Sequence, residues 1–504
     1  MKIRIIISIY ILSLQFFTTV FPDVNYHERI ERTASVVSQD HFFKEYDLRG
    51  RVGKDFEIKN VYGIARAIAA FFVQKNQQVK NIAVGMDGRL HSQAIKEQLC
   101  KAFIDSGLNV IFIGLCTTPV MYFATHMLDV DAGIMITASH NPKEDNGIKM
   151  VIGKESVWGN QIRTIRDMYN AGTSINANRV GVYSEHLLCT EYVHYLADKF
   201  KHLQGADIAC AIDCGNGAAG SVMPMLVKKM DWKNVMLMNA EVDGNFPNHD
   251  PDPTVAKNLH VLKNDLAKNK DLLFGMALDG DCDRLAVMTK SGYLIPGDQL
   301  VGLFSQSLAK SSSKDVVVDI MCSDAVVQQF KALGFTPHFA RTGIAFVKEA
   351  MKKHNALLGG EISGHVCFKD RYLGYDDGIY AIMRMIDMLH TSHKTLDDFV
   401  ALFPQKSITT TLSIHCDADK KFSIVEQAKK LFMGRSDVSI IDIDGVRLNT
   451  SYGCGILRPS NTEPIIRLRV EAQTEQGIAQ LKAEFFAALA PHFDAAWLKA
   501  QLSM

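Results

Sequence analysis

Residues 137–142 read TASHNP and bring a hydroxyl and an imidazole together at the end of an apolar run. Ser139 is therefore a candidate nucleophile, with His140 as its neighbour in the chain. A polar turn that leaves a buried strand is the competing interpretation. An Asn-Pro pair marks chain reversal, and Ser, Thr and Asn side chains bond nearby backbone amides. Other parts of the chain must decide between a chemical and a purely structural role.

The segment LDGDCDR carries three carboxylates at alternate positions, on Asp279, Asp281 and Asp283. Three carboxylates on a sharp loop repel one another unless a cation binds among them, and hard oxygen ligands suit Mg²⁺. A solvated acidic turn is the alternative. A calcium-binding EF-hand is excluded, because Arg284 stands where that loop needs Gly and Lys290 stands where it needs Glu.

The segment GEISGHVCF offers polar groups that suit sugar hydroxyls, and RPSNTEP offers groups that suit a phosphate. Glu361 and Ser363 can bond vicinal hydroxyls, and the alternative is a polar loop in which His365 caps a neighbouring element. The second segment supplies phosphate donors, since a planar guanidinium pairs with phosphate oxygens bidentately. A plain turn with an exposed arginine is the alternative there. Its candidate donors are Arg458, Ser460, Asn461 and Thr462.

The segment GNGAAG matches the glycine pattern of dinucleotide-binding proteins, with Glu241 further along the chain. A lone pattern of this kind is weak evidence, and close packing of a strand against a helix explains Gly215, Gly217 and Gly220 without a nucleotide. The sequence has no P-loop, HExxH or GxSxG signature. Nucleotide cleavage, zincin proteolysis and esterase chemistry therefore lack local support.

Four short apolar runs must position these candidates, at residues 81–89, 207–217, 272–284 and 315–323. Each resembles a strand buried on both faces, ends in Gly, Asp or Ser, and precedes a helix-like segment. This alternation is typical of parallel sheets, in which ligands bind beyond the carboxyl ends of the strands. We expect motifs from several domains to face a common cleft.

At 504 residues the chain is too long for one ordinary core. Its pattern predicts an α/β protein with three consecutive mixed-sheet domains, followed by alternating strands and helices typical of a small α+β lid domain. The expected boundaries are 1–38 for an N-terminal extension, 39–185 for the domain with Ser139, 186–293 for the domain with the acidic loop, 294–405 for the domain with GEISGH, and 406–504 for the lid.

The charge balance and the cysteine content restrict the binding partners and the cellular compartment expected for this protein. The 55 Lys and Arg residues balance 55 Asp and Glu residues, so no basic field would gather nucleic acid or anionic lipid. The 10 cysteines lack CxxC pairs, which suits reduced thiols in the cytosol. The N-terminal MKIRIIISIYILSLQFF is similar to a signal peptide or short anchor, although it is short for a membrane span of about 20 residues. We expect a cytoplasmic catalytic body, with membrane tethering left open.

The order of the motifs, TASHNP, DGDCDR, GEISGH and RPSNTEP, resembles the phosphohexomutase superfamily from about residue 42 to the C-terminus. The segment FFKEYDLRG, the form GEISGHVCF and the RPSNTEP loop are most similar to its bacterial phosphomannomutase/phosphoglucomutase branch. This resemblance implies three α/β domains and a lid around one central cleft, each contributing one loop.

The resemblance also implies a role for each motif. Ser139 would carry a phosphoryl group beside Mg²⁺ held by Asp279, Asp281 and Asp283. The group passes to a sugar hydroxyl, and the hexose 1,6-bisphosphate turns round and returns its other phosphate to Ser139. The residues implied around the phosphoserine are Arg49, His140, Lys149 and Arg284. The residues implied to bind substrate are Tyr46, Glu361, Ser363, His365, Arg458, Ser460, Asn461 and Thr462.

Two positions depart from the family pattern. Met321 stands where a Lys is usual and Ile344 where a His is usual, and Arg341 is a candidate to replace the missing cation. These changes leave open the preference for mannose or glucose. They also leave the alternative of a sugar-phosphate binding protein that has lost catalysis. The closest enzymatic alternative is a phosphoglucosamine mutase, whose C-terminal loop usually carries Gly where Asn461 stands. We expect small-molecule sugar phosphates as partners, a hexose bisphosphate activator, no nucleic acid, no obligate protein partner and a monomer.

Overall fold

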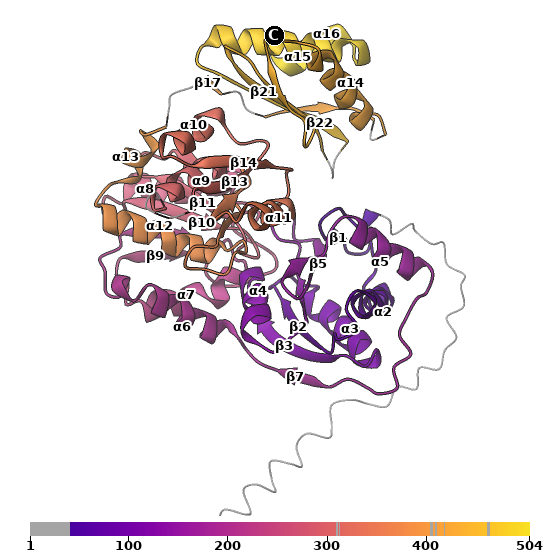
Figure 1. The fold of residues 1–504 in the computed structure, drawn as a ribbon. Coiled ribbons are helices and arrows are strands. Elements are labelled where there is room, and N and C mark those ends of the chain that lie inside the picture. The colour runs from indigo at the N-terminus through magenta and orange to yellow at the C-terminus, as the bar shows by residue number, and fades with distance from the viewer. Residues whose placement is uncertain are drawn as a thin grey trace, which may run out of the picture. The chain divides into compact units, whose positions relative to one another are not determined.

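The computed structural model describes residues 41–308, 311, 313–403, 407–408, 411–417, 419–460 and 464–504. The expectations for residues 1–38, and for Asn461 and Thr462, lie outside these ranges. Strands in the described ranges form sheets of seven, five, four and six strands in chain order (Figure 1). The first three sheets mix parallel and antiparallel pairs and the fourth is antiparallel, which confirms the expected fold class.

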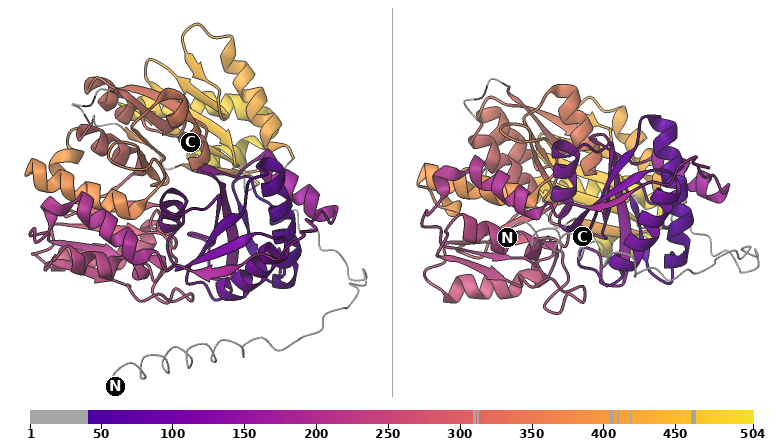
Figure 2. Two further views of the ribbon diagram at one scale, coloured as in Figure 1. Left: turned by 60° about the horizontal axis from the view of Figure 1, so that its bottom comes forward. Right: turned by 90° about the horizontal axis from the view of Figure 1, so that it is seen from below.

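The first sheet has the strand order β1-β5-β4-β2-β3-β7, with β6 paired to β5. Ile82 and Val84 of β2 pack with the helices α2 and α3, whereas Ala83 packs with α4, so this strand is buried on both faces as expected. Figure 2 shows this domain, in indigo and purple, from two further sides. The strands are β1 (Leu48–Arg51), β2 (Asn81–Met86), β3 (Asn109–Leu115), β4 (Ala132–Ile136), β5 (Asp145–Ile152), β6 (Glu155–Ser156) and β7 (Tyr183–Glu185). The helices are α2 (Ile58–Lys75), α3 (Ser92–Asp105), α4 (Thr118–Met127) and α5 (Asn160–Asn170).

The second sheet has the order β12-β11-β10-β8-β9 and explains the glycines of GNGAAG by packing. A Cβ atom on Gly217 would lie 2.8 Å from the carbonyl oxygen of Gly280, and one on Gly220 would lie 2.2 Å from that of Ala240. These close approaches favour the packing interpretation over a nucleotide. The strands are β8 (Cys210–Asp213), β9 (Val235–Met238), β10 (Phe274–Leu278), β11 (Leu285–Thr289) and β12 (Leu294–Ile295). The helices are α6 (Cys189–Lys199), α7 (Met223–Lys229) and α8 (His260–Lys268).

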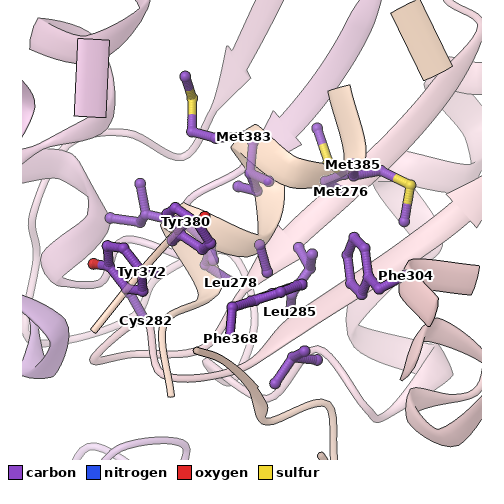
Figure 3. Close-up of a cluster of buried hydrophobic side chains, with 14 of the residues drawn as sticks. Met276, Leu278, Cys282, Leu285, Phe304, Phe368, Tyr372, Tyr380, Met383 and Met385 are labelled. Atoms are coloured by element: carbon purple, nitrogen blue, oxygen red, sulfur yellow. The ribbon is translucent and has the colours of Figure 1, made fainter. Parts of the chain in front are cut away.

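The third sheet, in the order β14-β13-β15-β16, shares a hydrophobic core with the second. Leu278 and Leu285 of the second sheet lie beside Phe368 and Tyr380 of the third domain (Figure 3). The rings of Phe368 and Tyr380 meet edge to face with centroids 5.3 Å apart. The strands are β13 (Asp315–Asp319), β14 (Thr336–Ala340), β15 (Leu358–Gly360) and β16 (Val366–Phe368). The helices are α9 (Gly297–Gln306), α10 (Asp324–Ala332), α11 (Ile344–His354), α12 (Gly378–Ser392) and α13 (Leu396–Val400).

The fourth sheet has the order β17-β22-β21-β20-β19, with β18 paired to β22, and the helices α14, α15 and α16 pack against it (Figure 1). The strands are β17 (Ser407–Ile408), β18 (Leu412–His415), β19 (Ser439–Ile441), β20 (Val446–Asn449), β21 (Gly453–Pro459) and β22 (Ile465–Ala472). The helices are α14 (Lys421–Met433), α15 (Glu475–Leu489) and α16 (Ala495–Leu502). Among the described residues, no helix has both the length and the apolarity that crossing a membrane requires.

The loop between β4 and β5 carries TASHNP and is held by one buried arginine. Arg89 is 3% exposed, and Asp87 lies 3.2 Å from its Nε. Its guanidinium donates hydrogen bonds of 2.6–3.0 Å to four loop carbonyl oxygens. Those carbonyls belong to Ser139, Asn141, Pro142 and Asp145. Since buried carbonyl groups need donors, Arg89 fixes the conformation of the loop around Ser139.

Replacing Arg89 by alanine is expected to loosen this loop. The four carbonyls lose a charged donor, and a hydrogen bond to a charged group contributes about 1.5–3 kcal/mol. Trypsin cleavage after the exposed Lys143 should rise roughly tenfold or more, because proteolysis follows local opening. Peptide mass spectrometry over a digestion time course measures this rate. Lys101→Ala removes an exposed ion pair with Asp105 and is the control. Equal rates at Lys143 in both variants would contradict the role of Arg89.

Candidate functional site

The acidic loop follows β10, and all three of its aspartates are buried. Asp279, Asp281 and Asp283 each place one carboxylate oxygen within 4.8 Å of the others. Cys282, between the last two, has a φ of 67°, which gives the loop a sharp left-handed turn. Burial, followed by the charges of Asp283 and Asp281, raises the pKa of Asp279 well above its usual range. The loop therefore concentrates negative charge that needs a counterion.

Ser139 lies directly against this loop. Its Oγ donates a 2.7 Å hydrogen bond to Oδ2 of Asp279 and lies 3.1 Å from Nδ1 of His140. The serine has a φ of 52°, which is unusual for a residue other than glycine. A Cβ atom on Gly280 would lie 2.4 Å from the carbonyl oxygen of Ser139, so the two loops can approach only because residue 280 is glycine.

Lys149 supplies positive charge to the acidic loop from β5. Its Nζ donates to Oδ2 of Asp281 at 2.7 Å and also contacts Asp283. Burial lowers the pKa of Lys149, but the charges of Asp281 and Asp283 raise it well above the usual range, so the lysine is protonated. Lys149 thus balances part of the negative charge of Asp281 and Asp283 by pairing with one oxygen of each.

Thr118 was not among the residues expected from the sequence. It begins α4, and its Oγ1 donates a 2.6 Å hydrogen bond to Oδ2 of Asp281. Its backbone N–H also bonds the carbonyl oxygen of Asp281, at 2.9 Å. The rule that ligand-binding residues follow buried strands could have identified it, because Thr118 comes soon after β3.

Arg49 and His140 lie on the first-domain side of the site. Arg49 donates to Asp47 and to Asn141, each at 3.1 Å. Burial lowers its pKa, but the charges of Asp47 and Asp281 raise it above the usual value. Burial and the charges of Arg284 and Arg49 hold the pKa of His140 well below its usual range. His140 is therefore a neutral imidazole beside the Ser139 hydroxyl.

The GEISGH loop after β15 reaches the acidic loop through His365. Nδ1 of His365 lies 3.0 Å from Oε2 of Glu361 and 2.8 Å from Oγ of Ser363, while Nε2 lies 3.3 Å from Oδ1 of Asp283. Arg284 Nε lies 3.3 Å from the same Nε2. Burial lowers the pKa of His365, but the charge of Asp283 raises it, to about 9. The predicted sugar-binding residues thus contact the predicted metal ligands.

His365 also belongs to a second group of candidate metal ligands. Asp283, His365 and Asp376 each place a ligand atom within 4.8 Å of the others. Lys348 Nζ lies 3.0 Å from Oδ1 of Asp376 and 3.3 Å from the hydroxyl of Tyr122. Asp376 could not be identified from its sequence pattern, because GYDDG is typical of an ordinary turn before a helix. Its carboxylate stabilises Lys348 inside the protein.

The RPSNTEP loop begins at the end of β21. Arg458 Nε lies 3.1 Å from Oδ2 of Asp444, and both side chains are buried. Ser460 is also buried, and its backbone N–H bonds the carbonyl oxygen of Ile465 at 2.9 Å. In the first domain, Tyr46 donates its hydroxyl to the carbonyl oxygen of Thr342 at 2.7 Å.

Met321 and Ile344, the two residues expected from the sequence to stand at usual Lys and His positions, both make apolar contacts. Met321 packs with Ile320 and Ile456, and Ile344 is half-buried near Tyr46. Arg341 is exposed, and its guanidinium lies over the ring of Phe346, 4.3 Å from its centroid. The Arg341 side chain is thus engaged with an aromatic ring of α11.

The acidic loop meets the requirements of a divalent cation site. Oδ1 of Asp281 is buried and accepts no hydrogen bond from the described part of the chain. A buried carboxylate oxygen without a donor is costly unless a cation binds it. Hard oxygen donors of this kind suit ions such as Mg²⁺. The arrangement can therefore hold a metal next to a serine hydroxyl, with sugar-suited and phosphate-suited loops nearby.

Four family models match consecutive segments of the chain. They are described as phosphoglucomutase/phosphomannomutase alpha/beta/alpha domain I, domain II, domain III and C-terminal domain. The matched residues are 40–176, 190–292, 296–406 and 415–488. Together these segments include every motif of the site.

Individual proteins match over most of their length. A phosphomannomutase/phosphoglucomutase of Pseudomonas aeruginosa is 36% identical over 451 residues, which cover 88% of this chain and 94% of that protein. A phosphoglucomutase of Neisseria gonorrhoeae is 37% identical, covering 89% of this chain and 96% of that protein. The crystal structure of a phosphoglucomutase/phosphomannomutase family protein from Burkholderia thailandensis has a TM-score of 0.82 at 30% identity, covering 90% of this chain and 98% of that one. This chain therefore belongs to the phosphoglucomutase/phosphomannomutase family of phosphohexomutases.

Proposed function

We propose that this enzyme interconverts hexose 1-phosphate and hexose 6-phosphate through a phosphoserine at Ser139, with glucose, mannose or both as the sugar. One observation carries the proposal: Ser139 Oγ lies 2.7 Å from Oδ2 of Asp279, inside the acidic loop. A serine that only bound sugar would face hydroxyl groups, whereas this one faces residues that suit a cation. Its position favours a serine that carries phosphate.

The proposed metal is Mg²⁺, held by Asp279, Asp281, Asp283 and an oxygen of phosphorylated Ser139. The buried Oδ1 of Asp281, which accepts no hydrogen bond from described residues, supports this assignment. When bound, the ion neutralises charge on the transferred phosphoryl group. Lys149 adds fixed positive charge at the same carboxylates.

In the proposed step, a hydroxyl oxygen of the sugar phosphate attacks phosphorus as the bond from phosphorus to Ser139 Oγ breaks. One phosphoryl group moves to the sugar and one proton moves to Ser139 Oγ. The neutral His140, with Nδ1 at 3.1 Å from Oγ, is suited to pass that proton. Arg49, Lys149 and Arg284 remain cations and stabilise the charge on phosphate.

The bisphosphorylated sugar then turns round, so that its other phosphate returns to Ser139. We assign contacts with the sugar to Tyr46, Glu361, Ser363 and His365. We propose that the phosphate that is not reacting is bound by Arg458, Ser460, Asn461 and Thr462. A catalytic trace of hexose 1,6-bisphosphate would serve as the activator, because it rephosphorylates Ser139 after the intermediate is lost.

We also propose the domain boundaries 39–185, 186–293, 294–405 and 406–504 and a monomeric enzyme in the cytoplasm. Every assigned motif lies after Phe42, and phosphorylated hexoses do not cross membranes freely. The segment 1–38 would then be dispensable for catalysis, whether or not it tethers the protein.

A second candidate, a sugar-phosphate binding protein without turnover, is favoured by the apolar contacts of Met321 and Ile344. We expect turnover on glucose 1-phosphate or mannose 1-phosphate, because the serine and acidic loops are complete. Glucosamine 1-phosphate should be slower, because Asn461 stands where phosphoglucosamine mutases usually carry Gly. A coupled assay of all three sugars with Mg²⁺ and bisphosphate measures this. Titration calorimetry that shows binding without phosphate exchange would support the second candidate. Faster turnover of the amino sugar would identify a phosphoglucosamine mutase.

Ser139→Ala is expected to reduce turnover roughly a thousandfold or more, because no oxygen remains to carry the phosphoryl group. The melting temperature should change little. Mass spectrometry of the wild-type enzyme should find phosphate on Ser139 and the variant should carry none. Ser184→Ala, a change in β7 outside the site, serves as the control. Activity near the wild-type level in Ser139→Ala would rule out the phosphoserine.

Removing the metal with EDTA should abolish activity, and added Mg²⁺ should restore it. Asp281→Asn should raise the Mg²⁺ concentration needed for half-maximal activity by roughly tenfold or more, since a charged ligand is lost. A Mg²⁺ titration of initial rates measures the shift. Asp271→Asn changes an exposed carboxylate of the same domain and should leave the titration unaltered. Activity that survives full removal of divalent ions would refute the metal assignment.

A further inference from the structure

The backbone of Thr342 and Gly343 is bonded on three sides by residues far apart in the sequence. The Thr342 N–H donates to Oδ2 of Asp444 at 3.1 Å, and the Thr342 carbonyl accepts the Tyr46 hydroxyl at 2.7 Å. The Gly343 N–H donates to Oε1 of Glu361. These three partners belong to the C-terminal sheet domain, the first domain and the GEISGH loop. Two consecutive residues thus connect three parts of the site.

Asp444 also holds the arginine of the RPSNTEP loop. The same Oδ2 that accepts the Thr342 N–H lies 3.1 Å from Nε of Arg458. Both side chains are less than 10% exposed, at 8% for Arg458 and 6% for Asp444, so solvent screens this pair weakly. Among the described residues Asp444 is the partner of Nε, which leaves the terminal nitrogens of Arg458 as the donors for a phosphate.

The position of Gly343 leaves little freedom for independent movement. Its φ is 126°, and a Cβ atom there would lie 2.7 Å from the ring of Tyr46. Glu361 is equally constrained, since its other oxygen lies 3.0 Å from Nδ1 of His365. A displacement of Asp444 therefore shifts Glu361, because Asp444 bonds the Thr342 N–H, Glu361 bonds the Gly343 N–H, and one peptide unit joins these two residues. Interactions packed this tightly transmit shifts instead of absorbing them.

We propose that Asp444 is a positioning residue that couples phosphate binding at Arg458 to the orientation of Glu361. The proposal rests on the proposed function, in which Arg458 binds phosphate and Glu361 binds the sugar. A phosphate that binds the terminal nitrogens of Arg458 fixes the guanidinium, and Asp444 then fixes the Thr342 and Gly343 backbone. Glu361 is thereby held more firmly for the sugar hydroxyls when phosphate occupies the neighbouring loop.

This coupling predicts opposite effects on two ligands. Asp444→Ala removes a negative charge beside Arg458, so local electrostatics favour tighter binding of inorganic phosphate. The same change releases the backbone that holds Glu361, so binding of glucose 1-phosphate should weaken. We expect the KM for glucose 1-phosphate to rise roughly tenfold or more, the size expected for a lost charge-assisted hydrogen bond. The inhibition constant of inorganic phosphate should stay constant or fall.

The experiment uses the full-length enzyme with Mg²⁺ and compares wild type, Asp444→Ala and Asp444→Asn. The asparagine keeps the shape of the side chain, so it remains informative where the alanine variant fails to fold. Asp437→Asn, which breaks an exposed ion pair with Arg435 in the same domain, is the matched control and should leave both constants within about twofold. Equal changes in both constants, or no change in either, would overturn the coupling.

Wild-type turnover distinguishes this inference from the proposed function. An active wild type whose Asp444 variants bind both ligands unchanged leaves the mutase assignment standing and refutes the coupling. An inactive wild type refutes the mutase assignment, and calorimetric titration of glucose 1-phosphate and inorganic phosphate into the same variants then decides the coupling. Weaker binding of the sugar phosphate alone supports it, and parallel changes refute it.

Discussion

Repulsion among three buried carboxylates is the constraint around which the site is built. Residues 279, 281 and 283 cannot all be ionised inside the protein without opposing charge. The first domain supplies Lys149 and Thr118 to Asp281, and the GEISGH loop supplies His365 to Asp283. The electrostatic demand of one loop thus links elements from three domains, and it also leaves a carboxylate oxygen suited to a cation.

Two arginines of the C-terminal domain bond main-chain carbonyl groups of the third domain. Arg469 donates to the carbonyl oxygen of Met321 at 2.8 Å, and Arg447 donates to those of Ile320 and Cys322. These contacts do not depend on the side chain at position 321. The apolar Met321 is therefore compatible with this attachment, and its side chain packs with Ile456.

The sequence predicted the parts of the site that lie directly at strand ends. Ser139 and the three aspartates follow buried strands, and parallel sheets gather such ends, so the pattern was enough to expect these residues close together. The roles expected of them came from the resemblance to a known family. The sequence did not predict the roles of Arg89, Thr118 and Asp444, because each of them bonds a partner that only the fold brings near. Thr118 and Asp281, for example, are 163 positions apart. Arg89 is recognisable only by the four carbonyls that surround it.

The hydrogen bond between Tyr46 and the carbonyl of Thr342 can form only late in synthesis on the ribosome. The two residues are separated by 296 positions, and a ribosome adding about 5–20 residues per second needs about 15–60 s to bridge them. Asp444 and Arg458 emerge later still. The emerging chain therefore presents the Ser139 loop long before its distant partners exist, and the complete set of contacts can form only after synthesis has reached the last domain.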